Sequence, residues 1–388
     1  MPHGHPVYTA MRTTIFEYMS GLSRELGAIN LGQGFPDGNG PPELREAAAR
    51  ALMDRSNQYP PSAGVPELRD AVAAFYRKRQ GLDLTRDEVI VTSGATEGIA
   101  VAVMALVQPG DEVILFAPAY DAYAPMVRRC GGVPVFVPLA PPGWSYDAAA
   151  IRAAITPRTR GMMLSDPLNP AGTVASEADL AMLAHLCTAH DLWAICDEVW
   201  EMVRFDGHPH RSLRSLPGMA ERTVKIGSAG KIFGLTGWKI GWLVAAPELA
   251  RLLARAHQFL TFTTPPALQW AVAEGLAMPA ALLDGILAEW TASRSRLAAG
   301  LTRAGFAVLP NAATWFLCVD LAASGIALDD ASFSERLIRE AGVASIPASA
   351  LFEGTGAPAH IVRFCFTKPD AMLDEACQRL AMFRSRLG

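Results

Sequence analysis

The sequence has little charge and no concentration of charge of one sign. Of its 388 residues, 34 are Lys or Arg and 38 are Asp or Glu, which leaves a net charge of -4 and no basic run. Nucleic acids and anionic membranes attract strongly basic surfaces. The composition therefore argues against both as partners.

Long hydrophobic runs are also missing. The longest apolar stretch, Ile99 to Val107, ends at Gln108-Pro109-Gly110 and is too short to span a bilayer. The N-terminal residues Met-Pro-His-Gly-His-Pro lack the basic and apolar regions of a signal peptide. We therefore expect a cytoplasmic protein.

Cysteine and histidine are sparse and scattered. The 6 cysteines never form a Cys-x-x-Cys pair, so neither a zinc site nor a disulfide framework is indicated. The one tight histidine cluster, His208-Pro209-His210, lies in a turn bounded by glycine and proline. We predict no metal site.

The chain is rich in short β-type runs, each followed by polar or glycine residues and then by a helical pattern. Such alternation predicts an α/β fold with a mostly parallel central sheet flanked by helices. A long helix is expected over 280–304, and a smaller α+β region with short strands near 319–321, 343–347 and 361–366. The strands of the main sheet are expected at 88–92, 111–116, 133–138, 160–164, 192–196 and 223–226.

Polar and small residues stand directly after these predicted strands. Ligands of parallel sheets bind beyond the carboxyl ends of the strands, so we expect the residues to converge on one crevice. The segment that begins at Gly94 also opens a helix, whose free N–H groups suit a phosphate. The residues concerned are Gly94, Ala95, Thr96, Tyr120, Asn169, Asp197, Ser228 and Lys231.

Residues 228–241 combine two cations, Lys231 and Lys239, with the Ser228 hydroxyl and several glycines. This set suits a phosphorylated cofactor, and a lysine there can form a Schiff base with an aldehyde. Taken alone, Lys231 could equally be a solvated loop lysine. A nucleotide-binding P-loop is excluded, because Ile232 follows Lys231 where that motif needs Ser or Thr.

Together the crevice residues suit a pyridine aldehyde that carries a phosphate. Lys231 can hold the aldehyde, and Asp197 can keep the ring nitrogen protonated. Arg363 lies between apolar residues of a predicted strand, which is costly unless it meets an anion. An edge-strand arginine in water is the alternative.

Several motifs make the sequence resemble the class I/II (fold-type I) pyridoxal-phosphate aminotransferases over nearly its whole length. It is most similar to the branch of kynurenine aminotransferase, glutamine transaminase K and methionine aminotransferase. The motifs are NLGQGFPD at 30–37, NQY at 57–59, SAGK at 228–231, TGWKIG at 236–241 and RFCF at 363–366.

The resemblance implies a fold of two parts and a homodimer with shared active sites. The N-terminal segment 1–40 would join a small C-terminal α+β domain, 281–388, and residues 41–280 would form the large cofactor-binding domain. It also implies pyridoxal 5'-phosphate as cofactor, with amino acids and 2-oxo acids as substrates.

The resemblance further implies a role for each site residue. Lys231 would bind the cofactor covalently and then act as general base and acid, with Asp197 at the ring nitrogen. Cofactor contacts would come from Gly94, Ala95, Thr96, Tyr120, Asn169, Trp200, Ser228, Lys239 and, from the partner subunit, Tyr59. Substrate contacts would come from Gly34, Phe16, Asn169 and Arg363, with Arg363 clamping the carboxylate.

Three positions depart from patterns of the wider family. Trp200 stands where a tyrosine usually donates to the cofactor's ring oxygen, so we expect altered cofactor absorption. Lys239 replaces the arginine of aspartate aminotransferases, as is usual in the branch named above. Ala171 replaces a threonine, which removes a cap.

No second arginine can be placed for a distal carboxylate, and Phe16 and Tyr120 indicate an apolar pocket. We therefore expect transamination between neutral amino acids, aromatic or sulfur-containing, and 2-oxo acids, with the cofactor alternating in a ping-pong cycle. A cysteine-conjugate β-lyase with the same cofactor is the nearest alternative. A non-catalytic cofactor-binding regulator is a more distant one.

Overall fold

The computed structural model describes residues 4–354 and 356–387 of the chain. Its larger sheet has the strand order β2-β8-β7-β6-β5-β3-β4, and β8 alone in this sheet runs antiparallel to its neighbours. The mostly parallel sheet predicted from the sequence is therefore confirmed. The strands are β2 (Val89–Ser93), β3 (Glu112–Ala117), β4 (Val133–Pro138), β5 (Thr159–Ser165), β6 (Trp193–Asp197), β7 (Thr223–Ser228) and β8 (Ile240–Val244).

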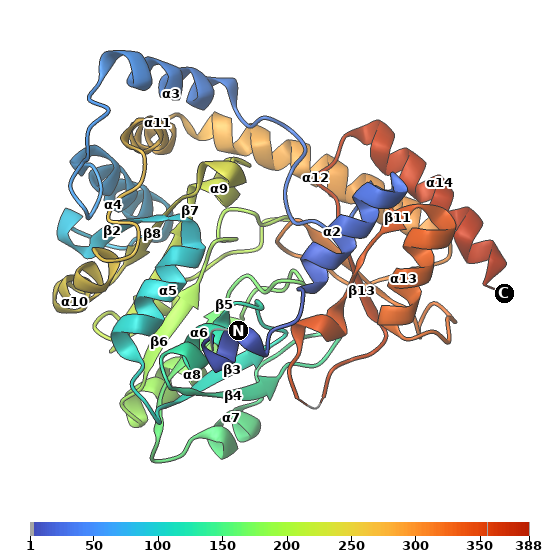
Figure 1. The fold of residues 1–388 in the computed structure, drawn as a ribbon, viewed down its shortest axis with the longest axis horizontal. Coiled ribbons are helices and arrows are strands. Elements are labelled where there is room, and N and C mark those ends of the chain that lie inside the picture. Colours follow the sequence, from blue (N-terminus) through green and yellow to red (C-terminus); the bar gives the residue numbers. More distant parts are fainter. Residues whose placement is uncertain (1–3, 355, 388) are drawn as a thin grey trace.

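The strands of this sheet are buried because helices cover it. In β3 and β8 every residue is buried, as expected for a sheet covered on both faces. Figure 1 shows α5 crossing in front of the strands, and α5 packs on β7 and β8. The helices of this part are α3 (Pro42–Asp54), α4 (Pro66–Gln80), α5 (Gly94–Leu106), α6 (Tyr123–Arg129), α7 (Ala148–Ala154), α8 (Glu177–Ala189), α9 (Ala229–Ile232), α10 (Pro247–His257) and α11 (Pro266–Ala277).

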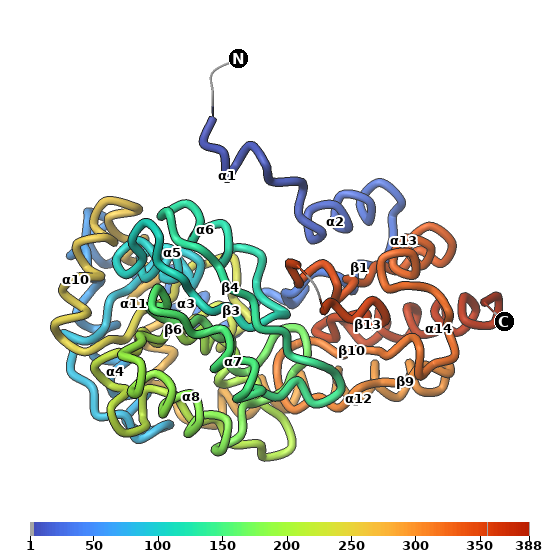
Figure 2. The backbone as a smooth tube through the Cα atoms, turned by 90° about the horizontal axis from the view of Figure 1, so that it is seen from below, coloured from blue at the N-terminus to red at the C-terminus, as the bar shows by residue number. Residues whose placement is uncertain are grey.

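Two further sheets lie in the C-terminal part, which both views place beside the larger sheet (Figures 1 and 2). One is antiparallel, with the order β12-β13-β10-β9, and the other pairs β1 with β11. The long helix α12 (Ala280–Arg303) leads into this part. The other elements are β9 (Ala307–Val308), β10 (Phe316–Asp320), α13 (Asp330–Ala341), β11 (Val343–Ala344), β12 (Ile346–Pro347), β13 (Ile361–Cys365) and α14 (Asp370–Arg386).

The N-terminal segment joins the C-terminal part, as the resemblance implied. It contains α1 (Pro6–Thr9), α2 (Ile15–Leu26) and β1 (Ile29–Asn30), and β1 pairs in parallel with β11 through Ile29 and Val343. Met19 and Leu22 of α2 share a small core with Ile338 of α13. Residues 1–3 of the segment lie outside the described residues, and the domain boundaries at 40 and 280 stay predictions.

The sequence patterns missed several elements. Helix α2 was not predicted, and neither was β8, which lies inside the glycine-rich stretch. Strand β8 lies between β2 and β7, so it holds those strands apart at the carboxyl edge of the sheet.

Within the described part of the chain, no single helix is long and apolar enough to cross a membrane. Helices α11 and α12 together have the length and apolar composition of a span, but they meet at a bend of 93°.

Candidate active site

A pocket of about 610 Å³ opens at the carboxyl edge of the larger sheet, facing the C-terminal part. Many of the predicted site residues line it: Phe16, Gly34, Tyr120, Asn169, Trp200, Lys231 and Arg363. A larger hollow of about 1120 Å³ lies between residues 36–43 and α12, and none of the predicted site residues lines it. The convergence of the predicted residues therefore identifies the smaller pocket as the candidate site.

Lys231 lies on α9, the short turn of helix that follows β7. Its Nζ lies 4.8 Å from the ring centre of Trp200 and 5.0 Å from that of Trp315, and it donates a hydrogen bond of 3.5 Å to the Gly34 carbonyl. Burial among these rings lowers the pKa of Lys231 to about 8, although the Asp197 carboxylate opposes the shift. Near neutral pH this amine is far easier to deprotonate than an ordinary lysine.

Asp197 is the last residue of β6 and is buried. Its Oδ2 accepts a hydrogen bond of 2.6 Å from the Tyr123 hydroxyl, a partner that the sequence analysis missed. Burial raises the pKa of Asp197, and no cation of the described residues lies within ion-pair distance of its carboxylate. Such a buried carboxylate is suited to a cationic group that enters the pocket.

The predicted phosphate-binding residues lie at the ends of three adjacent strands, β2, β8 and β7. Gly94 begins α5 with a φ of +70°, and a Cβ placed there would lie 3.1 Å from the Lys239 Nζ. A Cβ on Gly241 would lie 2.8 Å from the Ala95 nitrogen. Glycine is thus required where the Lys239 side chain and the start of α5 come together.

Ser228 and Thr96 belong to the same edge of the sheet. Ser228, at the end of β7, is buried and pairs with Gly241 of β8. Burial raises the pKa of the Tyr120 phenol, and the interaction with Thr96 partly opposes that rise. Tyr120 therefore connects the start of α5 to the pocket.

Arg363 lies on β13, an interior strand, and only 1% of it is exposed. An edge-strand arginine in water is therefore excluded. Its Nη1 donates to Asn169 Oδ1 at 3.1 Å and its Nη2 donates to the Gly32 carbonyl, whereas its Nε has no partner among the described residues. Burial lowers the pKa of Arg363 to about 10.

Aromatic rings surround this guanidinium. The Arg363 Cζ lies 3.9 Å from the ring centre of Phe316 and 5.1 Å from that of Phe16. A Cβ on Gly34 would lie 2.8 Å from the Phe316 ring, so a larger residue at Gly34 would displace that ring. The aromatic rings leave the guanidinium with few polar partners.

Trp200 is buried, and its ring packs edge to face against Trp315 at 4.9 Å and Phe316 at 5.4 Å. Sequence reasoning missed Trp315, because a tryptophan on an apolar run reads as core. It also missed Asp121 and Gln33, which line the pocket. Asp121 could have been noticed, since it follows Tyr120 after a predicted strand.

Tyr59 is not in the pocket. Its side chain is 85% exposed, and its ring makes an edge-to-face contact of 5.6 Å with Phe262. The predicted contact of Tyr59 with a cofactor phosphate is therefore not made within one chain.

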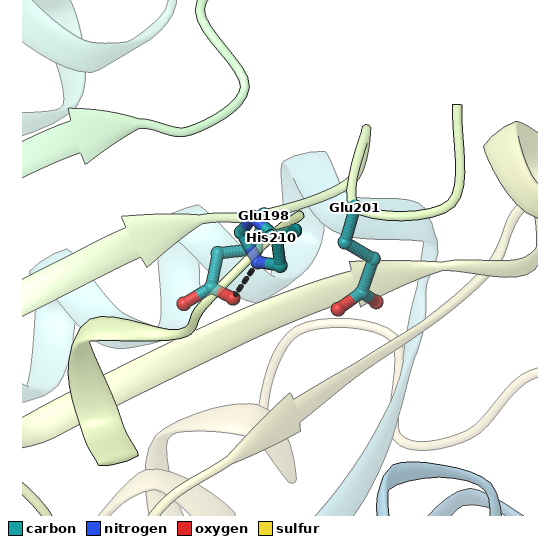
Figure 3. A group of neighbouring side chains, drawn as sticks. All are labelled: Glu198, Glu201 and His210. Carbon is teal, nitrogen blue, oxygen red and sulfur yellow. Dashed lines mark hydrogen bonds and ion pairs between the residues drawn. The ribbon is translucent and has the colours of Figure 1, made fainter. Parts of the chain in front are cut away.

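A second group of ionisable side chains lies just beyond Asp197. Glu198, Glu201 and His210 bring their ligand atoms within 4.8 Å of one another, and Figure 3 shows the contact of His210 with Glu198. The Lys225 ammonium forms ion pairs with both carboxylates. Since an ammonium already supplies the positive charge that these carboxylates need, this is an internal ion-pair cluster.

Comparisons with known proteins agree with this geometry. The family model described as aminotransferase class I and II matches residues 27–380. This chain belongs to the class I and II aminotransferases. Members of the family use pyridoxal 5'-phosphate, so the chain is a pyridoxal-phosphate-dependent aminotransferase of fold type I.

Three relatives show how similar the chain is to known aminotransferases. A probable N-succinyldiaminopimelate aminotransferase of Mycobacterium tuberculosis is 44% identical over 96% of this chain and 97% of its own. The solved structure of the N-succinyldiaminopimelate aminotransferase from Mycobacterium tuberculosis gives a TM-score of 0.94, covering 98% of this chain and all of the other. The methionine aminotransferase of Escherichia coli is 38% identical over 95% of both chains.

A third relative, kynurenine–oxoglutarate transaminase 3 of Rattus norvegicus, is 33% identical over 94% of this chain and 87% of its own. The similarity to the kynurenine and methionine aminotransferase branch is thereby confirmed.

The residues present fit the cofactor of this family. Asp197 offers a buried carboxylate that lacks a cation, and Lys231 offers an amine of lowered pKa. The glycine at position 94 leaves the start of α5 open beside Lys239. Asp197 therefore suits the protonated ring nitrogen of the cofactor, Lys231 suits its aldehyde, and the site at Gly94 and Lys239 suits its phosphate.

Proposed function

We propose that this aminotransferase transfers amino groups between neutral L-amino acids, aromatic or sulfur-containing, and 2-oxo acids. The observation that carries the proposal is the distribution of charge in the pocket. Among the lining residues, the cations are Lys231 and Arg363, and the walls between them are mostly apolar. One cation is needed for the cofactor, which leaves one for a substrate carboxylate.

Arg363 would hold that carboxylate. Its Nε lacks a partner among the described residues, and aromatic rings surround the guanidinium. An anion that binds there would therefore compensate for the lost hydration of the guanidinium charge. Asn169 would position Arg363 through the bond from Nη1. The side chain of the substrate would then extend toward Phe16, Tyr120 and the other apolar lining residues.

The cofactor would be held by residues from the sheet edge. Gly94, Ala95, Thr96, Ser228 and Lys239 would bind the phosphate, Asn169 and Trp200 would lie at the ring oxygen, and Tyr120 would pack on the ring. When bound, pyridoxal phosphate supplies an aldehyde and an electron-accepting ring that stabilises negative charge on the substrate α-carbon.

Asp197 would hold the proton of the ring nitrogen, and Tyr123 would fix the orientation of its carboxylate through the bond of 2.6 Å. Lys231 Nζ would bind the aldehyde and afterwards move the proton of the substrate α-carbon. Its lowered pKa suits both tasks, since the amine must lose and regain a proton near neutral pH. Repetition with a 2-oxo acid would complete a ping-pong cycle.

A donor screen on the purified enzyme tests the substrate class. We expect methionine, phenylalanine, glutamine or kynurenine to react with a 2-oxo acid, and aspartate to react poorly. Strong activity with aspartate and none with those neutral donors would contradict the proposal. Release of pyruvate and ammonia from cysteine conjugates without an acceptor would favour the β-lyase instead.

A second candidate substrate comes from the relative in Mycobacterium tuberculosis, whose name specifies N-succinyldiaminopimelate. That substrate has carboxylates beyond the one next to the reacting amine, and the lining residues of this pocket offer no cation beyond Lys231 and Arg363. We therefore rank it second, and N-succinyl-diaminopimelate belongs in the same screen.

We also propose a homodimer with shared active sites. Tyr59 is highly exposed, and so is Phe259, at 85% and 84%. A second copy of the chain would cover these rings, and the family resemblance implies that Tyr59 would then reach the partner's phosphate. Sedimentation of the holoenzyme would test the dimer, and the cytoplasmic location stays a prediction.

A further inference from the structure

The pocket contains one carboxylate for which the proposed function has no task. Asp121 follows Tyr120 after β3, is half-buried and lines the pocket together with Arg363 and Lys231. Within the described part of the chain, its carboxylate forms no ion pair and no hydrogen bond to another side chain. Partial burial of a carboxylate on an apolar wall costs free energy unless a bonding partner compensates for the lost water.

A role in helix capping does not account for Asp121. The N-cap of α6 is Ala122, and no side chain caps that helix. The carboxylate is instead electrostatically coupled to the pocket. Burial raises the pKa of Asp121, and a hydrogen bond from its own backbone N–H and the charge of Arg363 oppose that rise, while Asp121 in turn adds to the raised pKa of Tyr120.

We propose that Asp121 sets the charge selectivity of the substrate pocket by repelling a second carboxylate on the substrate side chain. This inference rests on the proposed function, in which Arg363 binds the first carboxylate. The first substrate carboxylate would neutralise Arg363, so a second carboxylate in the same pocket would meet the Asp121 charge without a free cation to balance it, and like charges in a pocket of low polarity repel strongly. A neutral side chain meets no such barrier, and an N–H group on it can donate to Asp121.

The test compares substrates of the same shape and different charge. We would measure kcat/KM for glutamate against glutamine, and for aspartate against asparagine, in the wild-type holoenzyme and in Asp121→Asn. The variant keeps the size of the side chain and removes its charge. We expect the ratio of acidic to neutral substrate to rise by about ten- to a hundredfold.

Two further variants keep the test decisive. Asp121→Glu retains the charge and should keep the ratio near that of the wild type. Asp284→Asn removes an exposed carboxylate of α12 that does not line this pocket, and it should leave the ratio unchanged. If Asp121→Asn does not fold, Asp121→Ser provides the same comparison.

An unchanged ratio in Asp121→Asn, or an equal loss with both members of each pair, would overturn the inference. A wild-type enzyme that prefers glutamate to glutamine would do the same. Failure of the proposed donor class looks different: methionine and phenylalanine would not react, while the shift in the acid-to-amide ratio could still be present.

Discussion

Lys225 and Lys231 lie six positions apart along β7 and its following turn, and their surroundings are opposite. Lys225 is fully buried and forms ion pairs with Glu198 and Glu201, which raise its pKa. Lys231 is partly accessible from the pocket, has aromatic rings near its Nζ, and has its pKa lowered to about 8. Lys225 is held protonated by its ion pairs, whereas Lys231 has the lowered pKa that its proposed role requires.

The comparison shows that burial alone does not define a reactive lysine. Burial disfavours the charge of both side chains, and the carboxylates near Lys225 more than offset that cost. The Asp197 carboxylate near Lys231 only partly does so, because Tyr123 and the Val199 N–H already bond to it. The cofactor ring would therefore find Asp197 without an ion-pair partner.

Replacement of the reactive lysine should have the largest effect. We expect Lys231→Ala to lower kcat/KM by roughly 10⁴-fold, because the group that binds the aldehyde and moves the α-carbon proton is lost. Steady-state kinetics and an absorption scan of the reconstituted protein would measure this. Lys78→Ala, at an exposed position on α4, is the matched control and should behave as the wild type.

Replacement of the structural lysine should instead reduce stability. We expect Lys225→Met to cost on the order of 3–5 kcal/mol, because it leaves the buried Glu201 carboxylate without its ammonium partner and leaves Glu198 with His210 alone. Folding raises the pKa of Lys225 above 10.5, so its contribution is fully present below pH 10.5 and is lost only as the pH rises through the folded value. Thermal melting at pH 7 therefore captures the whole effect.

The double variant Lys225→Met/Glu201→Gln provides the control for that experiment. Removal of one of the unpaired charges should recover part of the lost stability. If the double variant were less stable than Lys225→Met by the full cost of a second substitution, the two residues would not be coupled.

The pH dependence of cofactor binding tests whether the pKa of Lys231, unlike that of Lys225, is lowered. Only the neutral amine attacks an aldehyde, so reconstitution of cofactor-free protein should speed up as the pH rises and reach half its maximal rate near pH 8. Stopped-flow absorbance over pH 6.5–9.5 would follow it. A rate still rising steeply toward pH 10 would mean that the pKa of Lys231 is not lowered.

Of these variants, we expect replacement of Trp200, whose ring lies beside Lys231, to have the smallest effect. Trp200 stabilises the protonated amine by a cation–π contact of 4.8 Å. In Trp200→Leu the apparent pKa of reconstitution should fall by roughly 0.4–1.5 units, since such contacts contribute about 0.5–2 kcal/mol. A pKa that moved upward would show that Trp200 acts mainly by excluding water.

Much of this site could be predicted because its residues follow strands. Asp197, Ser228 and Gly94 each stand at the end of a β-type run, and parallel strands bring such positions to one edge. Arg363 stayed ambiguous, since only the pairing of β13 with strands on both sides shows that it is interior. Sequence patterns do not reveal which strands are neighbours.

The residues that were missed depend on tertiary packing. Tyr123 begins α6 after β3 and bonds to Asp197 at the end of β6, two strands away in the sheet, and nothing in its local sequence indicates that contact. Strand β8 was not predicted because it overlaps the TGWKIG motif at 236–241, which was interpreted as part of the cofactor site. The sequence around Lys225 and Lys231 does not show which of the two lysines is reactive. The difference comes from Glu198 and Glu201, which form ion pairs with Lys225.

The central claim is that Lys231, and not Lys225, binds the cofactor, and covalent trapping tests it most directly. The holoenzyme would be reduced with borohydride, digested and mapped by mass spectrometry. We predict the cofactor mass on the peptide that contains Lys231, at that residue. Its attachment to Lys225, or to any lysine other than Lys231, would contradict the account.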